Sequence, residues 1–409
     1  MAGLAEVEIT GIAAGGDGVG RTNGLVVFVP RTAVGDTASV RIKSGKRFAR
    51  GTLDALVLAS GTRTTPQCSH YVRDRCGGCQ LQHIEYAAQL EAKSAIVMDS
   101  LRRIGKRDVG RVDVIPSAAE WRYRRKLTLH LRRVGTRFIA GLHPYDSPAE
   151  VFDLRECPIT EDAVVALWQK MRSAFQHLPD VGELRVAVRR LRDGFSVTVE
   201  GASSWHEADR FFDAMPSVTE LWWKPDEGRL RRLRARGEAP EAGASFVQVN
   251  AGVADALHEH VLTRVRAHAP DTVIDAYAGS GATAIPLART ARVTAIELDR
   301  EAVALLALEL SAPSRTIGGK VEEHLERALP ADVVLLNPPR GGVDERVTQV
   351  LESADRAPRA IVYTSCDPAT LARDLARMPR YRIASIRAFD MFPQTAHVET
   401  VCELVPEAA

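Results

Sequence analysis

Hydrophobic and polar positions follow a different rhythm in each of three parts of the chain. In the first part, short apolar–polar alternations are separated by glycine-rich turns, which predicts five short strands closing into a small OB-like β-barrel. In the second part, strand and helix patterns alternate irregularly, as in an α+β domain. In the third, apolar strands alternate regularly with helices, which predicts a parallel, Rossmann-like α/β sheet. We therefore expect a multidomain protein with domains over residues 1–60, 61–240 and 241–409.

The composition of the 409 residues is that of a globular protein, with 45% hydrophobic and 26% charged residues. No apolar run is long enough for a membrane span, and the N-terminus lacks the basic and apolar regions of a signal peptide. We therefore expect a cytoplasmic protein that does not contact a membrane.

Positive charge is clustered, although the formal net charge is only +2. Residues 121–137 hold seven Lys or Arg and no acid, with aromatic and histidine side chains between them, and residues 229–236 hold five arginines. Such runs are often solvated surface, but phosphates bind cations and unstacked bases bind flat side chains. Both segments are therefore candidates for binding single-stranded nucleic acid.

Four of the six cysteines form a spaced set, in which Cys68, Cys76 and Cys79 are close together and Cys157 follows much later. In a chain without a signal peptide, such a set indicates metal binding rather than disulfides. Four thiolates suit either a tetrahedral zinc ion or a [4Fe-4S] cluster. Because the site would close a long loop, we expect it to be structural. The alternative is that Cys68 and Cys157 are ordinary core residues.

A glycine-rich turn follows the first strand of the predicted parallel sheet. Gly279 and Gly281 stand between strand and helix, where the first glycine makes the turn and the second lets a ligand approach the backbone. Asp275 at the strand end would repel a pyrophosphate but suits a cationic amino-acid group. Glu297 ends the next strand and can accept hydrogen bonds from ribose hydroxyls. The pattern favours S-adenosylmethionine, and NAD stays open as the alternative.

One cysteine, Cys366, stands between a buried strand and a helix start in the stretch YTSCDPATLARDL. Asp367 and Pro368 are typical of a helix N-cap and of the first helical position. Open α/β sheets bind ligands beyond the carboxyl ends of their strands, and a helix N-terminus favours a thiolate. Cys366 is therefore a candidate nucleophile, and a buried apolar cysteine is the alternative.

Two further stretches carry reactive groups. Asn337 and Arg340, in NPPR after an apolar strand, suit contacts with a base edge and with a phosphate or polarised carbonyl. The alternating tail AHVETV predicts a strand with His397 and Glu399 on one face. With Cys366, these groups fit one reaction: a thiolate adds to carbon 6 of uracil, carbon 5 takes a methyl group, and a carboxylate removes the carbon-5 proton. The base must be single-stranded or flipped out of the RNA.

The assembled motifs resemble those of the RNA (uracil-5-)-methyltransferases over nearly the whole chain. CGGCQLQHIEYAAQLEAK, FVQVN, DAYAGSG, YTSCDPATLARD and FPQTAHVE are similar to the family's motifs. The resemblance implies a TRAM domain for the barrel, S-adenosylmethionine and a [4Fe-4S] cluster as cofactors, and RNA as the partner. The residues so assigned are Cys68, Cys76, Cys79 and Cys157 for the cluster, Cys366 and Glu399 for catalysis, Gln248, Asp275, Tyr277, Gly279, Gly281, Glu297 and Asn337 for S-adenosylmethionine, and Arg340, Asn337 and His397 for the substrate.

A TRAM domain together with the cysteine set is more similar to the 23S ribosomal-RNA enzymes than to the transfer-RNA enzymes, which stay the alternative. We expect a monomer whose helix over about 85–115 packs on the catalytic domain. Two departures from the family pattern affect the site: Asn337 replaces an aspartate, and Asp367 replaces an asparagine. A negative Asp367 would oppose thiolate formation unless the helix N-terminus engages it as a cap. A catalytically impaired RNA-binding or ribosome assembly factor is therefore a third hypothesis.

Overall fold

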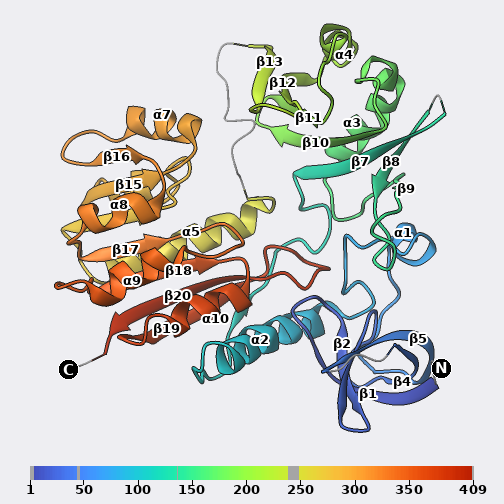
Figure 1. Ribbon diagram of the computed structural model, residues 1–409, viewed down its shortest axis with the longest axis horizontal. Coiled ribbons are helices and arrows are strands. Elements are labelled where there is room, and N and C mark those ends of the chain that lie inside the picture. The colour runs from blue at the N-terminus through green and yellow to red at the C-terminus, as the bar shows by residue number, and fades with distance from the viewer. Residues whose placement is uncertain (1–3, 44–46, 136, 238–247, 408–409) are drawn as a thin grey trace. The chain divides into compact units, whose positions relative to one another are not determined.

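The computed structural model describes residues 4–43, 47–135, 137–237 and 248–407 (Figure 1). Its contacts divide the chain into two compact units. Unit 1 comprises Met1–Arg63, His83–Ala118 and Ala251–Ala409, and unit 2 comprises Thr64–Gln82 and Ala119–Asn250. Compared with the predicted domain boundaries, these units place residues 83–118 with the barrel and the α/β domain. Among the described residues, no helix is both long and apolar enough to cross a membrane.

A closed five-stranded barrel forms the first part of unit 1, in the order β1-β2-β3-β5-β4. Alternate apolar side chains fill its interior, because each strand buries one face. Gly20 is needed where two strands approach closely, since a Cβ on it would lie 2.3 Å from the carbonyl oxygen of Glu8. The predicted barrel is confirmed, with β1 at Leu4–Ile12, β2 at Gly18–Thr22, β3 at Leu25–Val29, β4 at Thr37–Lys43 and β5 at Ala49–Leu58.

An eight-stranded sheet forms the second part of unit 1, in the order β16-β15-β14-β17-β18-β20-β19-β6. The strands from β16 to β18 pair in parallel, whereas β20 runs antiparallel to β18 and β19. The central strands are buried on both faces, so they are continuous apolar runs such as VVLL in β17. The strands are β6 Val114–Ile115, β14 Thr272–Ala276, β15 Arg292–Glu297, β16 Arg315–Gly318, β17 Val333–Leu336, β18 Ala360–Ser365, β19 Tyr381–Phe389 and β20 Glu399–Pro406.

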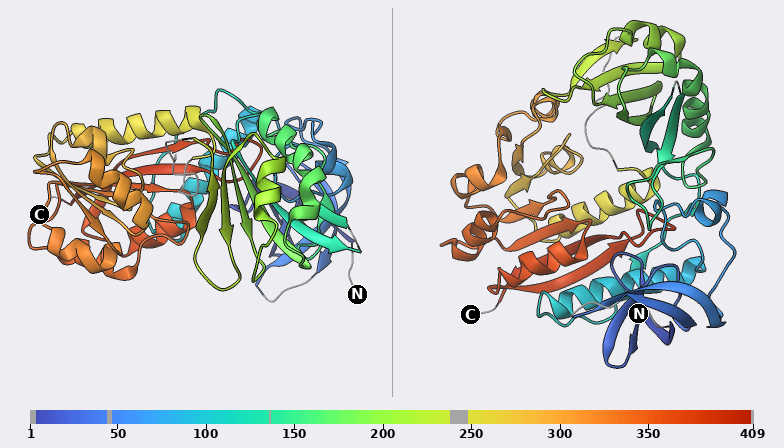
Figure 2. Two further views of the ribbon diagram at one scale, coloured as in Figure 1. Left: turned by 90° about the horizontal axis from the view of Figure 1, so that it is seen from above. Right: turned by 45° about the vertical axis from the view of Figure 1, so that its right-hand side comes forward.

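Helices cover both faces of this sheet, and each face has its own apolar cluster. Figure 2 shows α5, in yellow, on one side of the sheet and the orange-red helices α9 and α10 on the other. One face carries α5 (Ala251–Arg266), α6 (Ala284–Leu287) and α7 (Arg300–Glu309), and the other carries α2 (Tyr86–Arg103), α8 (Val321–Ala328), α9 (Glu345–Ser353) and α10 (Pro368–Ala376). α2 contacts both α10 and β1 of the barrel. This arrangement confirms the predicted Rossmann-like α/β domain.

Unit 2 is built on a seven-stranded sheet in the order β13-β12-β11-β10-β7-β8-β9. All neighbouring strands pair antiparallel except β11 and β12, and an apolar cluster joins the sheet to its helices. Its elements are α1 Ser69–Arg73, β7 Lys126–Val134, β8 Arg137–Leu142, β9 Phe152–Asp153, α3 Asp162–Met171, η1 Arg172–His177, β10 Glu183–Leu191, β11 Gly194–Glu200, α4 Ala208–Ala214, β12 Val218–Lys224 and β13 Arg231–Ala235.

Candidate active site

The end of β18 and the start of β20 lie side by side in the sheet of unit 1 (Figure 1). Cys366 directly follows β18, and Glu399 is the first residue of β20. In the antiparallel pairing of these two strands, Ser365 stands opposite Thr400. Continuing this register by one residue places Cys366 opposite Glu399. The thiol and the carboxylate that the sequence predicts as a reacting pair therefore come from adjoining strand ends.

Arg340 is the cation that acts on both groups. Burial raises the pKa of Glu399, which is 4% exposed, to about 7, and Arg340 opposes this rise. The pKa of the Cys366 thiol is raised to about 11, first by burial and then by the charge of Glu399, and Arg340 opposes this rise. Arg340 is itself exposed, in the turn after β17. The three side chains thus share one electrostatic environment, with a carboxylate suited to accepting a proton near neutral pH.

Asp367 caps the helix that starts behind Cys366. Its Oδ1 accepts hydrogen bonds from the backbone N–H groups of Ala369 and Thr370, each at 2.9 Å. The predicted cap is therefore present, but it uses the helix N-terminal N–H groups that were expected to favour a thiolate. In the free enzyme the pKa of the Cys366 thiol is raised by burial, by Glu399 and, more weakly, by Asp367, so an effect of the helix N-terminus on the thiolate stays a prediction.

His397 lies outside the strand that the sequence predicts for it. β20 begins only at Glu399, so His397 precedes it in a loop and is exposed. Its ring meets that of Phe392 edge to face, with 5.9 Å between centroids. The prediction of a shared strand face for His397 and Glu399 is wrong, because the first is exposed and the second buried.

Two carboxylates flank the glycine-rich turn after β14. Asp275 is buried and accepts a hydrogen bond from the Thr283 hydroxyl at 2.6 Å. Burial raises the pKa of Asp275 to about 7, a rise that the hydrogen bond from Thr283 opposes. Glu297 accepts from the N–H of Gly279 at 2.8 Å on one oxygen and from those of Leu298 and Asp299, at 2.7 and 2.8 Å, on the other. The turn is therefore tied to the end of β15.

The two glycines of this turn have different tasks. Both have positive φ, +56° at Gly279 and +90° at Gly281, which side chains other than glycine rarely adopt. A Cβ on Gly279 would meet no atom within 4 Å, so its backbone borders open space that a ligand can enter. A Cβ on Gly281 would lie 2.4 Å from Cδ1 of Leu306 in α7. Gly281 thus permits helix packing rather than the ligand approach expected of it.

Tyr277 and Asn337 border the same turn in different ways. Tyr277 has a positive φ of 65°, and its side chain packs with the apolar cluster of the face that carries α8, α9 and α10. Burial raises the pKa of its phenol. Asn337 is exposed where β17 ends, and its backbone N–H donates to Ala276 at 3.3 Å. Asn337 is thus open to solvent where β17 ends, Tyr277 supplies its backbone to the turn, and ligand contacts of both residues stay predictions.

Gln248 belongs to unit 2, while Asp275 and Glu297 belong to unit 1. It is partly buried, and Phe246 and Val247 of the same motif, FVQVN, lie outside the described residues. A contact between Gln248 and S-adenosylmethionine stays a prediction.

The four cysteines of the predicted metal site line one cavity of about 150 Å³ in unit 2. All four are buried. Burial raises the thiol pKa of Cys68 and Cys79, and the charge of the nearby Cys157 also raises both. Hydrogen bonds to the two sulfur atoms oppose this rise. Within the described ranges, no group of three or more His, Cys, Asp or Glu is arranged to hold a metal ion. The four thiols are gathered as predicted, but a metal centre is not shown.

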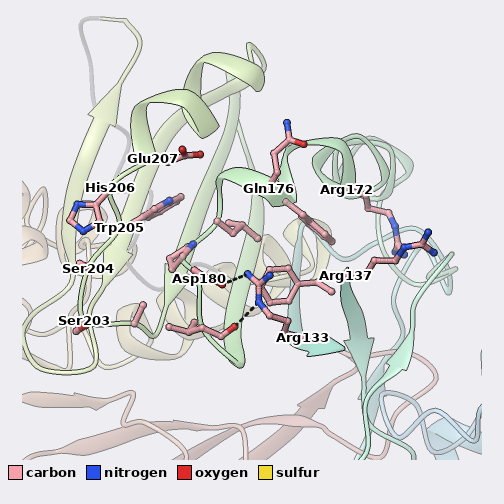
Figure 3. A pocket seen from close by; sticks show the side chains of 16 residues that line it. Arg133, Arg137, Arg172, Gln176, Asp180, Ser203, Ser204, Trp205, His206 and Glu207 are labelled. Atoms are coloured by element: carbon pink, nitrogen blue, oxygen red, sulfur yellow. Dashed lines mark hydrogen bonds and ion pairs between the residues drawn. The ribbon is translucent and has the colours of Figure 1, made fainter. Parts of the chain in front are cut away.

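A larger cavity of about 870 Å³ lies elsewhere in unit 2 and contains none of the predicted site residues (Figure 3). Arg133 and Arg137 of the basic run 121–137 line it. The Arg133 guanidinium pairs with Asp180 at 3.1 Å and stands 4.4 Å from the ring centroid of Phe138. At least this arginine of the predicted RNA-binding run is therefore used in internal contacts.

Two family models match parts of unit 1. Residues 325–405 match the family model of the tRNA (uracil-5-)-methyltransferases, and residues 5–54 match that of the TRAM domain. An uncharacterized RNA methyltransferase of Protochlamydia amoebophila is 32% identical over 431 residues, covering 98% of this chain and 97% of its own. The chain belongs to the RNA (uracil-5-)-methyltransferase family. Another uncharacterized RNA methyltransferase, from Synechocystis, is 31% identical and covers 99% of this chain and 96% of its own.

The fold of this RNA (uracil-5-)-methyltransferase also has a solved counterpart. The tRNA (uracil-54, C5)-methyltransferase of Pyrococcus abyssi, solved with S-adenosyl-L-homocysteine, superposes with a TM-score of 0.70. The match covers 98% of this chain and 99% of the other at 23% identity, so it concerns the fold. The predicted TRAM barrel and methyltransferase activity are confirmed, and the predicted S-adenosylmethionine and RNA agree with family membership.

Buried residues that sequence reasoning missed support the loop before Glu399 in this methyltransferase. Lys93 of α2 is fully buried and forms an ion pair with Asp390, which follows β19 and is also fully buried. Tyr86 donates to the same carboxylate at 2.7 Å, and Lys93 donates to the carbonyl of Phe392 at 3.0 Å. Burial lowers the pKa of Lys93, and Asp390 opposes this effect. The sequence could have indicated this contact, because Lys93 stands among the residues on the buried face of α2.

Proposed function

We propose that this methyltransferase acts through a covalent bond between the Cys366 sulfur and carbon 6 of a uracil in RNA, with Glu399 as the final base. The observation that carries the proposal is the placement of Cys366 and Glu399 at adjoining strand ends under the influence of Arg340. The mechanism requires that the Cys366 thiol and the Glu399 carboxylate reach the same uracil ring. If the two groups were far apart, one could not add to the ring while the other removes a proton from it.

The electron balance of the reaction assigns one task to each residue. The Cys366 thiol first loses its proton to solvent. The thiolate then forms a bond to carbon 6, and the electrons of the carbon 5–carbon 6 double bond shift toward oxygen 4 as an enolate. Carbon 5 then takes the methyl group. Glu399 removes the proton from carbon 5, the double bond reforms, and the sulfur leaves as a thiolate. Arg340 is suited to stabilising both the thiolate and the enolate oxygen.

The turn after β14 and the end of β15 would hold S-adenosylmethionine, which supplies the methyl group from its sulfonium. The backbone at Gly279 borders open space, so no side chain obstructs a ligand there. Oε2 of Glu297 accepts one backbone hydrogen bond and keeps a second lone pair for a ribose hydroxyl, whereas Oε1 already accepts two. Buried Asp275 suits the cationic amino-acid end, because a nearby positive charge would offset the burial that raises its pKa.

The substrate proposed is 23S ribosomal RNA, in a single-stranded or flipped-out conformation. A TRAM barrel combined with four gathered cysteines supports this choice. The match to the tRNA (uracil-5-)-methyltransferase model keeps transfer RNA as the second candidate. Mass spectrometry of 5-methyluridine in both RNA pools, with and without the gene, separates them. Loss of one ribosomal 5-methyluridine is expected, and loss confined to transfer RNA would contradict the proposal.

The four-cysteine cavity fits a [4Fe-4S] cluster better than one zinc ion. Cys68, Cys76, Cys79 and Cys157 surround a common space, yet within the described part of the chain they are not drawn together around one ion. A cubane cluster binds one thiolate at each of four separate iron atoms, so its ligands need not converge on a point. Iron and sulfide in anaerobically purified protein are expected, and stoichiometric zinc would contradict this assignment.

A covalent trap tests the proposed chemistry. RNA that contains 5-fluorouridine lacks the carbon-5 proton, so Glu399 cannot complete the reaction and the adduct persists. We expect a denaturation-resistant protein–RNA band that Cys366→Ala abolishes, together with a loss of methyl transfer on the order of 10⁴-fold or more. Cys402→Ala is the matched control, because Cys402 is a fully buried cysteine of β20 that stands opposite Tyr363. An adduct that persists in Cys366→Ala would refute the mechanism, and wild-type protein without methyl transfer would favour the assembly factor.

A further inference from the structure

Arg340 is presented by a tight turn after β17. The N–H of Gly342 donates to the carbonyl of Pro339 at 2.9 Å, which closes a four-residue turn with Arg340 at its second position. Arg340 is exposed, so few of its own side-chain contacts are available to fix it. The position of its guanidinium relative to Cys366 therefore depends on what holds this turn.

Asp374 of α10 holds the residue that follows the turn. It is fully buried, and its Oδ2 accepts from the N–H of Val343 at 3.0 Å. The same oxygen accepts from the hydroxyl of Tyr363 at 2.8 Å, and Tyr363 lies on β18, three residues before Cys366. One carboxylate oxygen therefore ties the Arg340 turn to the strand that carries the nucleophile.

Arg373 holds the turn itself. Its Nη2 donates to the carbonyl of Gly341 at 2.8 Å and to Oδ1 of Asp374 at 2.8 Å. Its Nε donates to the same Asp374 oxygen at 2.9 Å. The planar guanidinium thus bridges the backbone beside Arg340 and the buried carboxylate, a geometry that lysine would not reproduce.

Gly342 shows how closely the turn is seated. Its φ is +76°, and a Cβ there would lie 2.4 Å from Oδ2 of Asp374 and 2.6 Å from Nη2 of Arg373. Both contacts are far shorter than side-chain atoms tolerate, and the acceptor and donor are themselves fixed by hydrogen bonds. The backbone at this position has little freedom to move relative to α10.

We propose that Asp374, together with Arg373 and Tyr363, is a positioning residue that fixes the Arg340 turn relative to Cys366. The inference rests on the proposed role of Arg340 in the reaction. α10 begins at Pro368, directly behind Cys366 and its cap Asp367. The helix that starts at the nucleophile thus also carries, two turns later, the groups that hold the opposing cation.

A double-mutant cycle distinguishes positioning from general support of the fold. In Asp374→Asn, an amide NH₂ faces Arg373 or replaces the acceptor of Tyr363 and Val343, so the turn loosens. We expect kcat for methyl transfer to fall about 10- to 100-fold, since small misplacements of reacting groups cost about that much. In an Arg340→Gln background, the same change should lower kcat by less than about threefold, because the group it positions is already gone.

Equal losses in both backgrounds would overturn the inference, because they would show that Asp374 acts independently of Arg340. If Arg340→Gln alone leaves kcat unchanged, the inference fails as well. The proposed function would survive that result, because the 5-fluorouridine adduct tests Cys366 separately. The two proposals therefore fail in distinguishable ways.

Glu403→Gln is the matched control. Glu403 is a buried carboxylate of β20 in the same sheet, and it pairs with Arg264 at 2.9 Å and accepts from the Ser385 hydroxyl at 2.8 Å. It should resemble Asp374→Asn in stability loss, yet leave kcat of the folded protein near the parental value. Should Asp374→Asn not fold, Gly342→Ala replaces it, because the added methyl disturbs the same turn while Asp374 is intact. The same coupling with Arg340→Gln is expected.

Discussion

Cys366 in unit 1 and Cys79 in unit 2 are both thiols whose pKa is raised by burial, but their surroundings differ. Two charged side chains act on Cys366: Glu399 raises the pKa of its thiol further, and Arg340 opposes this rise. Around Cys79 the next contributions come from other cysteines, with Cys157 the strongest, and a hydrogen bond from Gln82 is the opposing influence. Arg340 thus lowers the pKa of the Cys366 thiol, whereas the charges that act on Cys79 are those of other cysteines, which would repel one another once ionised.

The difference indicates how each site can use a thiolate. In the proposed mechanism, a single anion forms at Cys366 next to Arg340 and is consumed by bonding to carbon, so a high resting pKa would protect the thiol between turnovers. In the four-cysteine cavity, four thiolates would be stable only around a positively charged inorganic core. A raised pKa therefore does not by itself identify a catalytic cysteine, and the neighbouring charges decide between the two roles.

The largest effect expected within unit 1, apart from loss of Cys366, is that of Glu399→Gln. Without the base, the carbon-5 proton stays and the sulfur cannot leave, so kcat should fall on the order of 10²- to 10⁴-fold. A covalent adduct with ordinary uridine RNA should accumulate, visible as a shifted band in denaturing gels. Turnover near the parental rate, or no adduct despite slow turnover, would show that another group removes the proton.

The same substitution should stabilise the fold. Burial raises the pKa of Glu399 from 4.5 to about 7, so the folded state binds this proton more tightly than the unfolded state does. Stability is therefore lost as pH rises from 4.5 through 7, and at pH 8 the ionised carboxylate costs roughly 3 kcal/mol. Glu399→Gln should recover most of this in urea unfolding at pH 8 and little at pH 4.

The elements that place this pair could be read from the sequence, because strand and helix periodicity are local. Apolar runs ending in polar residues predicted that Cys366 lies at the carboxyl edge of the sheet, and the fold confirms it. The start of β20 was misplaced by three residues, since the alternation in AHVETV continues through a loop. Alternation alone does not distinguish a paired strand from an extended loop segment.

The contacts that hold the site could not be read in the same way. Asp374 meets Val343 and Tyr363, and Lys93 meets Asp390 almost three hundred residues away, so each partner is fixed only by the tertiary fold. One signal was available: Asp374 falls between Leu371 and Leu375, on the apolar face of its helix. An ionisable residue on such a face predicts a buried partner, although it does not say which.

Arg340→Gln should have the next largest effect and sharpens the contrast between the two thiol environments. In the parent enzyme, the rate of adduct formation with 5-fluorouridine RNA should rise about tenfold per pH unit below the thiol pKa of about 11. Because Arg340 lowers the pKa of Cys366, its removal should raise that pKa and slow the adduct about tenfold at pH 8 through the thiol alone, and the lost stabilisation of the enolate should add to this effect. The profile should keep its slope and move to higher pH.

Arg382→Gln is the control for the loss of one arginine, since Arg382 is an exposed residue of β19. Its profile should coincide with that of the parent. A profile for Arg340→Gln that also coincides with the parent would remove the difference in neighbouring charge on which the contrast between Cys366 and Cys79 depends.

Cys79→Ser should have the smallest effect on chemistry and tests the other side of the contrast. If the four thiols hold a [4Fe-4S] cluster, removing one ligand should lower the iron and sulfide content and the unfolding temperature of unit 2, because metal-binding free energy contributes to folding. Adduct formation at saturating 5-fluorouridine RNA should stay within about threefold of the parent, as expected for changes without shared partners. Cys402→Ser, which alters a buried cysteine of β20, should leave the iron content unchanged. If Cys79→Ser changes neither iron content nor stability, the [4Fe-4S] assignment fails and the four cysteines are protonated core residues.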